Sequence, residues 1–183
     1  MLVPNFNPFP VLETKRLVLR RPVMADVDEM FIYRSDKMLM QYIPHRLATQ
    51  KQQVVEMLRF INNLIDKNEG INWAITLKGN DIIIGMVGYV HFFTDDYRAE
   101  IGYMLHTPYH GKGIIHEAMK AAMDYGFNVL KLHSIEAIVN CENVPSKKVL
   151  ERIGFSKDAF FKDYLFHDGK FIDANVYSFV KSE

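Results

Sequence analysis

Residues 107–119, TPYHGKGIIHEAM, place two glycines on either side of one lysine, between an apolar strand-like segment and a helix-like one. Glycine allows main-chain conformations that other residues rarely adopt, so successive N–H groups of such a turn can converge on one anion. A helix that starts directly afterwards adds the positive end of its dipole. The turn therefore favours phosphate as its ligand, although a strained strand-to-helix turn can also need glycine for its φ angles alone.

Three better-known motifs fail on spacing. A Walker loop ends in G-K-[ST], whereas Gly113 follows Lys112 here. A dinucleotide fingerprint needs a third glycine where His116 stands. His116-Glu117 begins an H-E-x-x-H zinc motif, but Lys120 occupies the place of the second histidine, and the other histidines show no ligand spacing. We therefore expect an anion site and no metal.

The segments before the turn predict one strand, two helices and three more strands. TKRLVLRRP, residues 14–22, alternates like a strand that ends at its proline. A helix follows, with Asp26 and Glu29 at capping-box spacing, and Thr49 with Gln52 forms a second box. The second helix carries a stripe of apolar side chains at helical spacing, namely Val54, Leu58, Ile61 and Ile65. Short turns then separate strands at 71–77, 82–93 and 98–105.

The segments after the turn complete the order. A helix over 114–130, a strand over 133–140, and a helix over 143–153 that is closed by Gly154 are expected, followed by a hairpin centred on Asp168-Gly169. The strand-helix-strand passage from 98 to 140 requires a parallel pair, whereas the short turns require antiparallel ones. The sequence thus predicts an α/β chain with a mixed, mostly antiparallel sheet of about seven strands flanked by helices.

Composition limits the class of protein. The 183 residues, 49% of them apolar, suit a single domain over residues 1–183. Lys plus Arg and Asp plus Glu balance at 22 each, so no overall field attracts nucleic acid or an anionic membrane. Cys141 is the only cysteine, and no apolar run reaches the roughly 18 residues of a membrane span. We therefore expect a cytoplasmic protein that recognises its partners locally.

Three segments together resemble one family. RAEIGYMLHTPYHGKGIIHEAM, NCENVPSKKVLERIGF and the opening LETKRLVLRRPVMADVDEMF are similar to the GNAT superfamily of acetyl-CoA-dependent N-acetyltransferases, specifically to its RimJ/RimL-like branch, which modifies protein N-termini and related amines. The resemblance extends over nearly the whole chain. It implies the GNAT fold, in which one strand of the parallel pair splays from its neighbour and CoA binds in the gap.

The resemblance also implies a binding site for acetyl-CoA. In the family, the glycine turn binds the CoA pyrophosphate, and the pantetheine arm bonds to the main chain of the splayed strand. By this analogy the pyrophosphate-binding residues are His110, Gly111, Lys112, Gly113 and Ile114. The corresponding strand residues are Met104, Leu105 and His106.

Acetyl transfer to an amine needs a base, because only the unprotonated amine attacks a thioester. Glu100 is the best-placed candidate, since a carboxylate in the middle of this strand needs either solvent or a cleft. A solvated face is the ordinary alternative. The resembling branch has a glutamate at this place that is proposed as base or substrate anchor. Asp95, Asp96 and Glu117 are weaker candidates.

Asn143 and Ser146 have two interpretations. Asn-x-x-Ser at the start of a helix is first of all a capping arrangement. In the resembling family, however, the asparagine contacts the pantetheine or acetyl region, and the serine is proposed to protonate the CoA thiolate. A cap and a contact can coexist. Tyr103 is a second candidate for the acid.

The acceptor amine is the least determined part of the reaction. By analogy, residues 38–46 and the hairpin residues Phe160, Phe161 and Tyr164 flank the acceptor cleft, although such side chains more commonly belong to a core. A protein or peptide N-terminus is the leading acceptor. A small-molecule amine, such as a polyamine, an amino acid or an antibiotic, is the alternative, and a homodimer is left open. A non-catalytic CoA-binding module is disfavoured because Glu100 and Ser146 accompany the complete turn.

Overall fold

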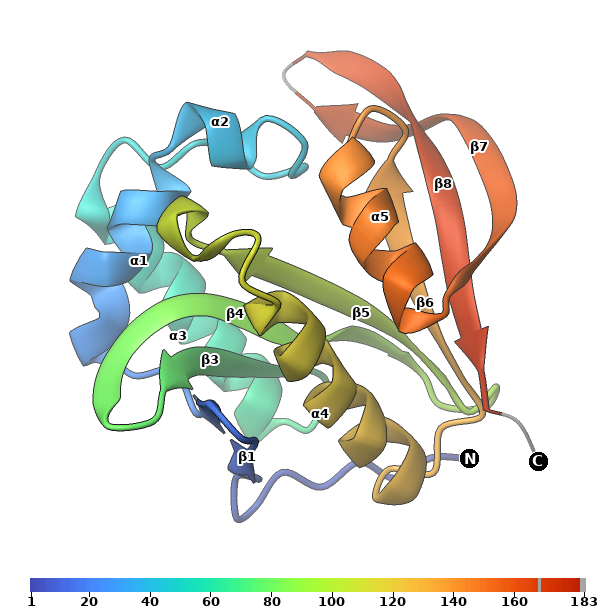
Figure 1. Ribbon diagram of the computed structural model, residues 1–183, viewed down its shortest axis with the longest axis horizontal. Helices are drawn as coiled ribbons and strands as arrows, with labels where there is room; N and C mark the ends of the chain where they lie inside the picture. The colour runs from blue at the N-terminus through green and yellow to red at the C-terminus, as the bar shows by residue number, and fades with distance from the viewer. Residues whose placement is uncertain (168, 182–183) are drawn as a thin grey trace.

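The computed structural model describes residues 1–167 and 169–181, and in this part of the chain eight strands form one sheet (Figure 1). Their order across the sheet is β1-β2-β3-β4-β5-β6-β8-β7. The strands are β1 Leu12–Glu13, β2 Leu17–Arg20, β3 Ile71–Leu77, β4 Asn80–Phe93, β5 Arg98–Leu105, β6 Ser134–Asn140, β7 Ser156–His167 and β8 Lys170–Val180. The helices are α1 Val27–Arg34, α2 Lys37–Met40, α3 Lys51–Asp66, α4 Ile114–Asn128 and α5 Val144–Ile153, with short 3₁₀ turns at Met24–Asp26 and Thr107–Tyr109.

The parallel pair that the sequence predicts is β5 with β6. Its ladder is short: Arg98 pairs with Ser134, Ala99 with Ile135, and Glu100 with Glu136. Beyond Glu100, β5 stays paired with β4 as far as Leu105, while β6 stays paired with β8 as far as Asn140. The two strands therefore separate, and a gap opens between them.

Helices cover both faces of the sheet. In Figure 1, α4 and α5 lie in front of the strands, and α1 and α3 lie behind them. Because side chains alternate along a strand, Ile101 and Leu105 of β5 join the core that contains α4. Met104 faces the other way and packs against the cluster formed by α1 and α3. Three members of the predicted stripe on α3 are buried, Val54 and Leu58 in that second cluster and Ile65 in the first, whereas Ile61 is half-buried against the first cluster.

Several local predictions need correction. The sheet has an eighth strand, the two-residue β1, and an extra short helix, α2, starts where the Asp36 carboxylate accepts the amides of Met38 and Leu39. The Asp26 side chain does not cap α1; it binds Arg20 and the Val23 amide.

The second predicted capping box is displaced by one residue. The α3 helix starts at Lys51, and Gln53 rather than Gln52 accepts the Thr49 and Gln50 amides. The terminal hairpin is present between β7 and β8, with Gly169 at φ +80°; Asp168 of the predicted turn lies outside the described residues.

The α4 helix is fixed to the sheet through an aromatic cluster. Tyr89 of β4 is fully buried, and its hydroxyl donates to the Ala122 carbonyl at 2.8 Å. Trp73 packs edge-on against Tyr89 and Tyr125, with ring centroids 6.3 and 5.5 Å apart. Gly126 leaves space for Tyr89, since a Cβ at this position would overlap the hydroxyl. None of the described helices is long and apolar enough to cross a membrane.

We expect Gly126→Ala to destabilise the protein by about 1–3 kcal/mol, the usual cost of overpacking a core, although alanine favours the helix. Urea unfolding measures the change. In a Tyr89→Phe background the cost of Gly126→Ala should shrink, because the overlapping hydroxyl is gone. Equal costs in both backgrounds would show that Tyr89 is not the obstacle.

Candidate active site

The gap between β5 and β6 is bridged by two hydroxyl groups. Tyr103 lies on β5 beyond the end of the parallel ladder, and Ser146 lies in the first turn of α5, directly after β6. Their side-chain oxygens are 2.6 Å apart, and the Tyr103 hydroxyl is also 3.2 Å from the Ser146 carbonyl. The two acid candidates from the sequence therefore form one hydrogen-bonded pair.

The Tyr103–Ser146 pair is protonated at neutral pH. Burial raises the pKa of Tyr103 to about 12, although the hydrogen bond with Ser146 opposes part of this rise. Asn143 holds Ser146 in place, since its side-chain oxygen accepts the Ser146 amide at 3.1 Å. The predicted cap at Asn143 is confirmed, and the pair can supply a proton to an anion that arrives between the strands.

Glu100 approaches the gap from the opposite face of β5. It is half-buried, and its Cα partners are His91 on β4 and Glu136 on β6. Burial raises the pKa of the Glu100 carboxyl, and the Glu136 carboxylate raises it further. Glu136 itself forms an ion pair with Arg98 at 3.3 Å. Glu100 is therefore not a fully solvated surface carboxylate, and its role as base stays a prediction.

The glycine turn has the geometry of an anion cradle. Gly111 and Gly113 have φ angles of +73° and +72°, and the turn is exposed. Within the described residues, the amides of Gly111, Lys112 and Gly113 donate to no main-chain or side-chain acceptor. The α4 helix begins at the next residue, Ile114, so its positive end faces the same place. These free donors fit a pyrophosphate.

The main chain of β5 is partly engaged where the sequence places the pantetheine arm. The His106 amide donates to the Ile84 carbonyl at 2.8 Å, and Met104 is the ladder partner of Met86. The Leu105 carbonyl points away from β4 and lies 2.7 Å from Nε2 of His110. Of the three predicted residues, Leu105 thus presents its carbonyl to the gap, and the His110 ring contacts it.

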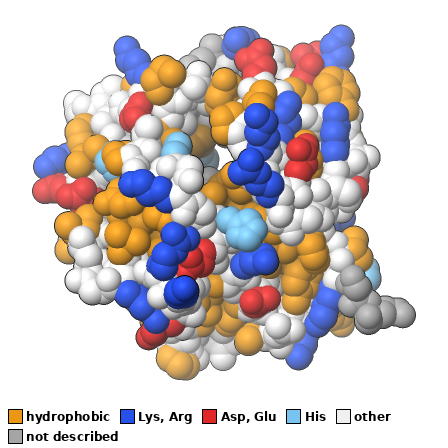
Figure 2. Space-filling view, in the orientation of Figure 1, with side chains coloured by type: hydrophobic (Ala, Val, Ile, Leu, Met, Phe, Trp, Pro, Cys, Tyr) orange, Lys and Arg blue, Asp and Glu red, His pale blue; other side chains and the backbone are white. Residues whose placement is uncertain are grey.

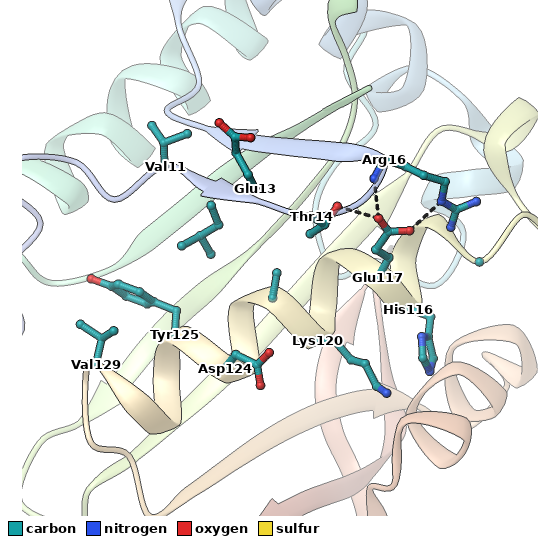
Figure 3. A pocket seen from close by; sticks show the side chains of 13 residues that line it. Val11, Glu13, Thr14, Arg16, His116, Glu117, Lys120, Asp124, Tyr125 and Val129 are labelled. Carbon is teal, nitrogen blue, oxygen red and sulfur yellow. Dashed lines mark hydrogen bonds and ion pairs between the residues drawn. The ribbon is translucent and has the colours of Figure 1, made fainter. Parts of the chain in front are cut away.

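An ion pair that the sequence did not reveal holds the glycine turn. In Figure 3, Glu117 of α4 accepts hydrogen bonds from the Thr14 hydroxyl, at 2.6 Å, and from the main-chain and side-chain nitrogens of Arg16, at 2.9 and 2.6 Å. The Arg16 guanidinium also donates to the Lys112 carbonyl at 3.0 Å. The turn that precedes β2 therefore fixes both the start of α4 and the cradle.

This network makes Glu117 a poor general base. Although partial burial acts in the opposite direction, the bonds from Thr14 and Arg16 lower the pKa of its carboxyl. Asp95 is exposed, and Asp96 lies 3.8 Å from Arg98. Glu100 remains the carboxylate that best suits the role.

Two surface features surround the cradle. A groove of about 900 Å³ lies between β1 and the outer side of α4; it meets the cradle at Gly113 but contains neither Tyr103 nor Ser146 (Figure 3). Basic side chains gather over α5 in Figure 2, a helix that contributes Lys147, Lys148 and Arg152. This positive charge beside the cradle favours a polyanionic ligand.

The side chains expected to flank the acceptor are exposed. Met38 is 74% exposed, and Phe160, Phe161 and Tyr164 of β7 are between 42 and 53% exposed. These four side chains therefore do not belong to the core, whereas Met40 of the same segment is buried. Their contact with an acceptor stays a prediction.

A mixed sheet whose parallel strands separate beside a glycine cradle, with a base candidate on one face and an acid candidate on the other, defines an acyltransferase that uses a CoA thioester. The chain belongs to the GNAT family of acetyltransferases, because the family model described as the acetyltransferase (GNAT) domain matches residues 16–156. It is an acetyl-CoA-dependent N-acetyltransferase. Among the described residues, no group of three or more His, Cys, Asp or Glu side chains could hold a metal ion.

Individual relatives agree with this assignment. The chain is 36% identical over 172 residues to the uncharacterized N-acetyltransferase p20 of Bacillus licheniformis, covering 94% of this chain and 97% of p20. A crystal structure of a GNAT-family acetyltransferase from Bacillus anthracis superposes with a TM-score of 0.83 at 28% identity, over 95% of this chain and 100% of the other.

Two further relatives from Escherichia coli match about half of this chain, each at 34% identity. One is the [ribosomal protein uS5]-alanine N-acetyltransferase, over 50% of this chain and 47% of its own length. The other is spermidine N(1)-acetyltransferase, over 49% and 48%. The first supports the RimJ/RimL-like branch, and the pair shows that the acceptor varies among relatives.

We expect Glu100→Gln to raise the melting temperature at neutral pH. The raised pKa means that the folded protein holds the Glu100 proton more tightly than the unfolded chain does, so this residue lowers stability as the pH rises. The gain should appear as the pH rises past the ordinary glutamate pKa of about 4.3, level off above the raised pKa of the folded protein, and vanish well below the ordinary value, where both states are protonated. Thermal unfolding across this range measures it, with the exposed Glu142→Gln as control. A gain that is independent of pH would contradict the assignment.

Proposed function

We propose that this single-domain enzyme acetylates the N-terminal amine of a protein or peptide, with Glu100 as base and the Tyr103–Ser146 pair as acid. The observation that carries the catalytic part is the placement of these groups on opposite faces of the strand that borders the gap. Acetyl-CoA supplies the activated acyl group. Residues 110–114 bind its pyrophosphate, and the Leu105 carbonyl and Asn143 bind its pantetheine arm.

The base acts on the acceptor side of the sheet. Glu100 accepts a proton from the ammonium group, directly or through water, and the free amine then attacks the thioester carbonyl. Its raised pKa suits this task, because a base whose pKa lies closer to the working pH takes up the proton more readily. The C–N bond forms as the C–S bond breaks.

The acid acts on the other side of the gap. The departing thiolate takes a proton from the Ser146 hydroxyl, and Tyr103 replaces it through their 2.6 Å hydrogen bond. The phenol is a stronger acid than an alkyl hydroxyl, so the pair as a whole is a better proton source than serine alone. The Asn143 cap keeps Ser146 oriented toward the gap.

Two observations support a peptide as acceptor. The uS5-alanine relative modifies a ribosomal protein, and exposed aromatic side chains on β7, among them a stacked Phe161 and Tyr164, offer a surface on which an extended chain can lie. A polyamine is the second candidate. The spermidine relative and the adjacent Glu100 and Glu136 carboxylates favour it.

The acceptor is tested by thiol release from acetyl-CoA with free-N-terminal peptides, polyamines and amino sugars, each with wild type and Glu100→Gln. We expect saturable release with peptides and a loss of roughly 10²-fold or more in kcat/KM in the variant, the usual scale of a general base. The deficit should shrink as the pH approaches the pKa of the amine. Saturation by spermidine alone would replace the peptide with a polyamine; a deficit confined to acceptor KM at every pH would make Glu100 a substrate anchor.

The acid is tested by Ser146→Ala and Tyr103→Phe. Ser146→Ala should lower kcat by about 10-fold or more with little change in the KM of acetyl-CoA, whereas Tyr103→Phe should lower kcat by less. If Tyr103 acts through Ser146, the double variant should be no slower than Ser146→Ala. Multiplied single effects would instead show that each hydroxyl acts on the thiolate by itself.

A further inference from the structure

Arg34, the last residue of α1, is buried without an anionic partner. It is 9% exposed, yet within the described residues its guanidinium forms no ion pair and no hydrogen bond. By contrast, the Arg20 side chain, which is 16% exposed, forms an ion pair with Asp26 at 2.7 Å. A guanidinium carries five N–H donors and does not lose its proton in proteins, so an unpaired buried one is costly.

Among the residues that the structure describes, no carboxylate acts on the Arg34 guanidinium, although Asp26 is close enough to act on the neighbouring Tyr33. Burial lowers the pKa of the Arg34 guanidinium, and only the neighbouring Tyr33 phenol acts in the opposite direction. His45 is close enough for Arg34 to lower the pKa of its imidazole, after the larger effect of burial, and His167 of β7 does the same. Within the described residues, no carboxylate therefore compensates the charge of Arg34.

A second unsatisfied donor lies beside Arg34. The Tyr33 hydroxyl is buried, with the residue 1% exposed, and has no hydrogen-bond partner in the described structure. Its ring centroid is 6.3 Å from that of His106, the residue that follows β5. Buried hydroxyls are nearly always hydrogen-bonded, so this orphaned hydroxyl, next in sequence to the unpaired Arg34, points to a ligand.

These donors lie on the acceptor side of the sheet. Tyr33 belongs to the cluster against which Met104 packs, and Met104 and Glu100 point to the same face of β5. Met104 is four positions after Glu100, which is about 13 Å along a strand. The segment after α2 folds back over this place, since the Ala48 amide donates to the Arg34 carbonyl at 3.0 Å.

We propose that Arg34, together with the Tyr33 hydroxyl, binds a carboxylate or phosphate of the acceptor while the acceptor amine lies at Glu100. This inference rests on the proposed function and narrows it to acceptors that carry an anionic group in addition to the amine. The guanidinium fork pairs such a group through two parallel hydrogen bonds. A polyamine would meet a buried positive charge instead, so the same residue disfavours it.

The experiment compares tetrapeptides with an N-terminal alanine that differ only by Asp in place of Asn at the second, third or fourth residue. Phosphoethanolamine with ethanolamine forms the small-molecule arm, and spermidine the cationic one. For wild type, we expect at least one acidic acceptor to exceed its neutral counterpart by about tenfold or more in kcat/KM, the scale of one charge-assisted bond. Which arm shows the preference identifies the source of the anion.

Arg34→Gln should abolish this preference by raising the KM of the acidic acceptor, with the KM of acetyl-CoA unchanged. Arg34→Lys, which keeps the charge but not the fork, should retain part of it. Arg59→Gln is the matched control, because Arg59 is an exposed arginine of α3, outside the segments expected to flank the acceptor. It should behave as wild type.

Stability without acceptor provides an independent measurement. Arg34→Met should raise the melting temperature, because it replaces an uncompensated buried charge by an apolar side chain of similar length. The preferred acidic acceptor should then stabilise wild type in thermal unfolding and leave the Met variant unchanged. A lower melting temperature for Arg34→Met would show that Arg34 supports the fold, and would overturn the proposal.

The outcomes separate this inference from the proposed function. Peptides that are acetylated equally well with Asp and Asn, by wild type and Arg34→Gln alike, would overturn the role of Arg34 and keep the peptide acceptor. Preference for phosphoethanolamine over every peptide would overturn the peptide acceptor and keep the role of Arg34. Preference for spermidine would overturn both.

Discussion

The ladder between β5 and β6 ends after Glu100 and Glu136, and the rest of the structure is arranged around this interruption. Main-chain groups that leave a ladder need other partners, because an unsatisfied buried group is costly. Leu105 obtains one from the His110 ring, and the gap itself is spanned by Tyr103 and Ser146. The family to which the chain belongs binds a CoA thioester, and a strand edge with displaceable partners is a suitable place for its extended arm.

The gap is useful only if its borders are rigid. On one side, the buried Tyr89 hydroxyl fixes α4 to the sheet. Arg16 and Thr14 then fix Glu117, one turn into α4, and Arg16 also holds the Lys112 carbonyl. The amides of the cradle thus point outward because the opposite side of the turn is already bonded. Preorganised donors of this kind bind an anion without first paying to order themselves.

The sequence predicted what depends on neighbouring residues. Gly111 and Gly113 could be recognised because two glycines directly before a helix indicate a turn with positive φ angles, which the structure contains. Asn143 could be recognised because helix caps follow local rules. The network of Arg16 with Glu117 joins residues 101 apart, and no local pattern marks it. No sequence pattern marks Arg34, since its burial depends on how the chain folds back at Ala48. The sequence left open whether the β7 aromatics lie in the core or beside the acceptor cleft, because residue type suggests burial but tertiary position decides it.

Glu100 and Arg34 show that the acceptor side keeps two groups at a cost to stability. Burial and Glu136 make the ionised Glu100 less favourable in the folded protein, and this same shift brings the pKa of Glu100 closer to that of an amine. Arg34 is buried without a counter-charge. In the proposed roles, the acceptor would supply what is missing, since its ammonium group would compensate Glu100 and its anionic group would compensate Arg34. An acceptor with both charges would remove both unfavourable contributions to the free energy of the folded enzyme. The enzyme would therefore bind such an acceptor more tightly than one with a single charge.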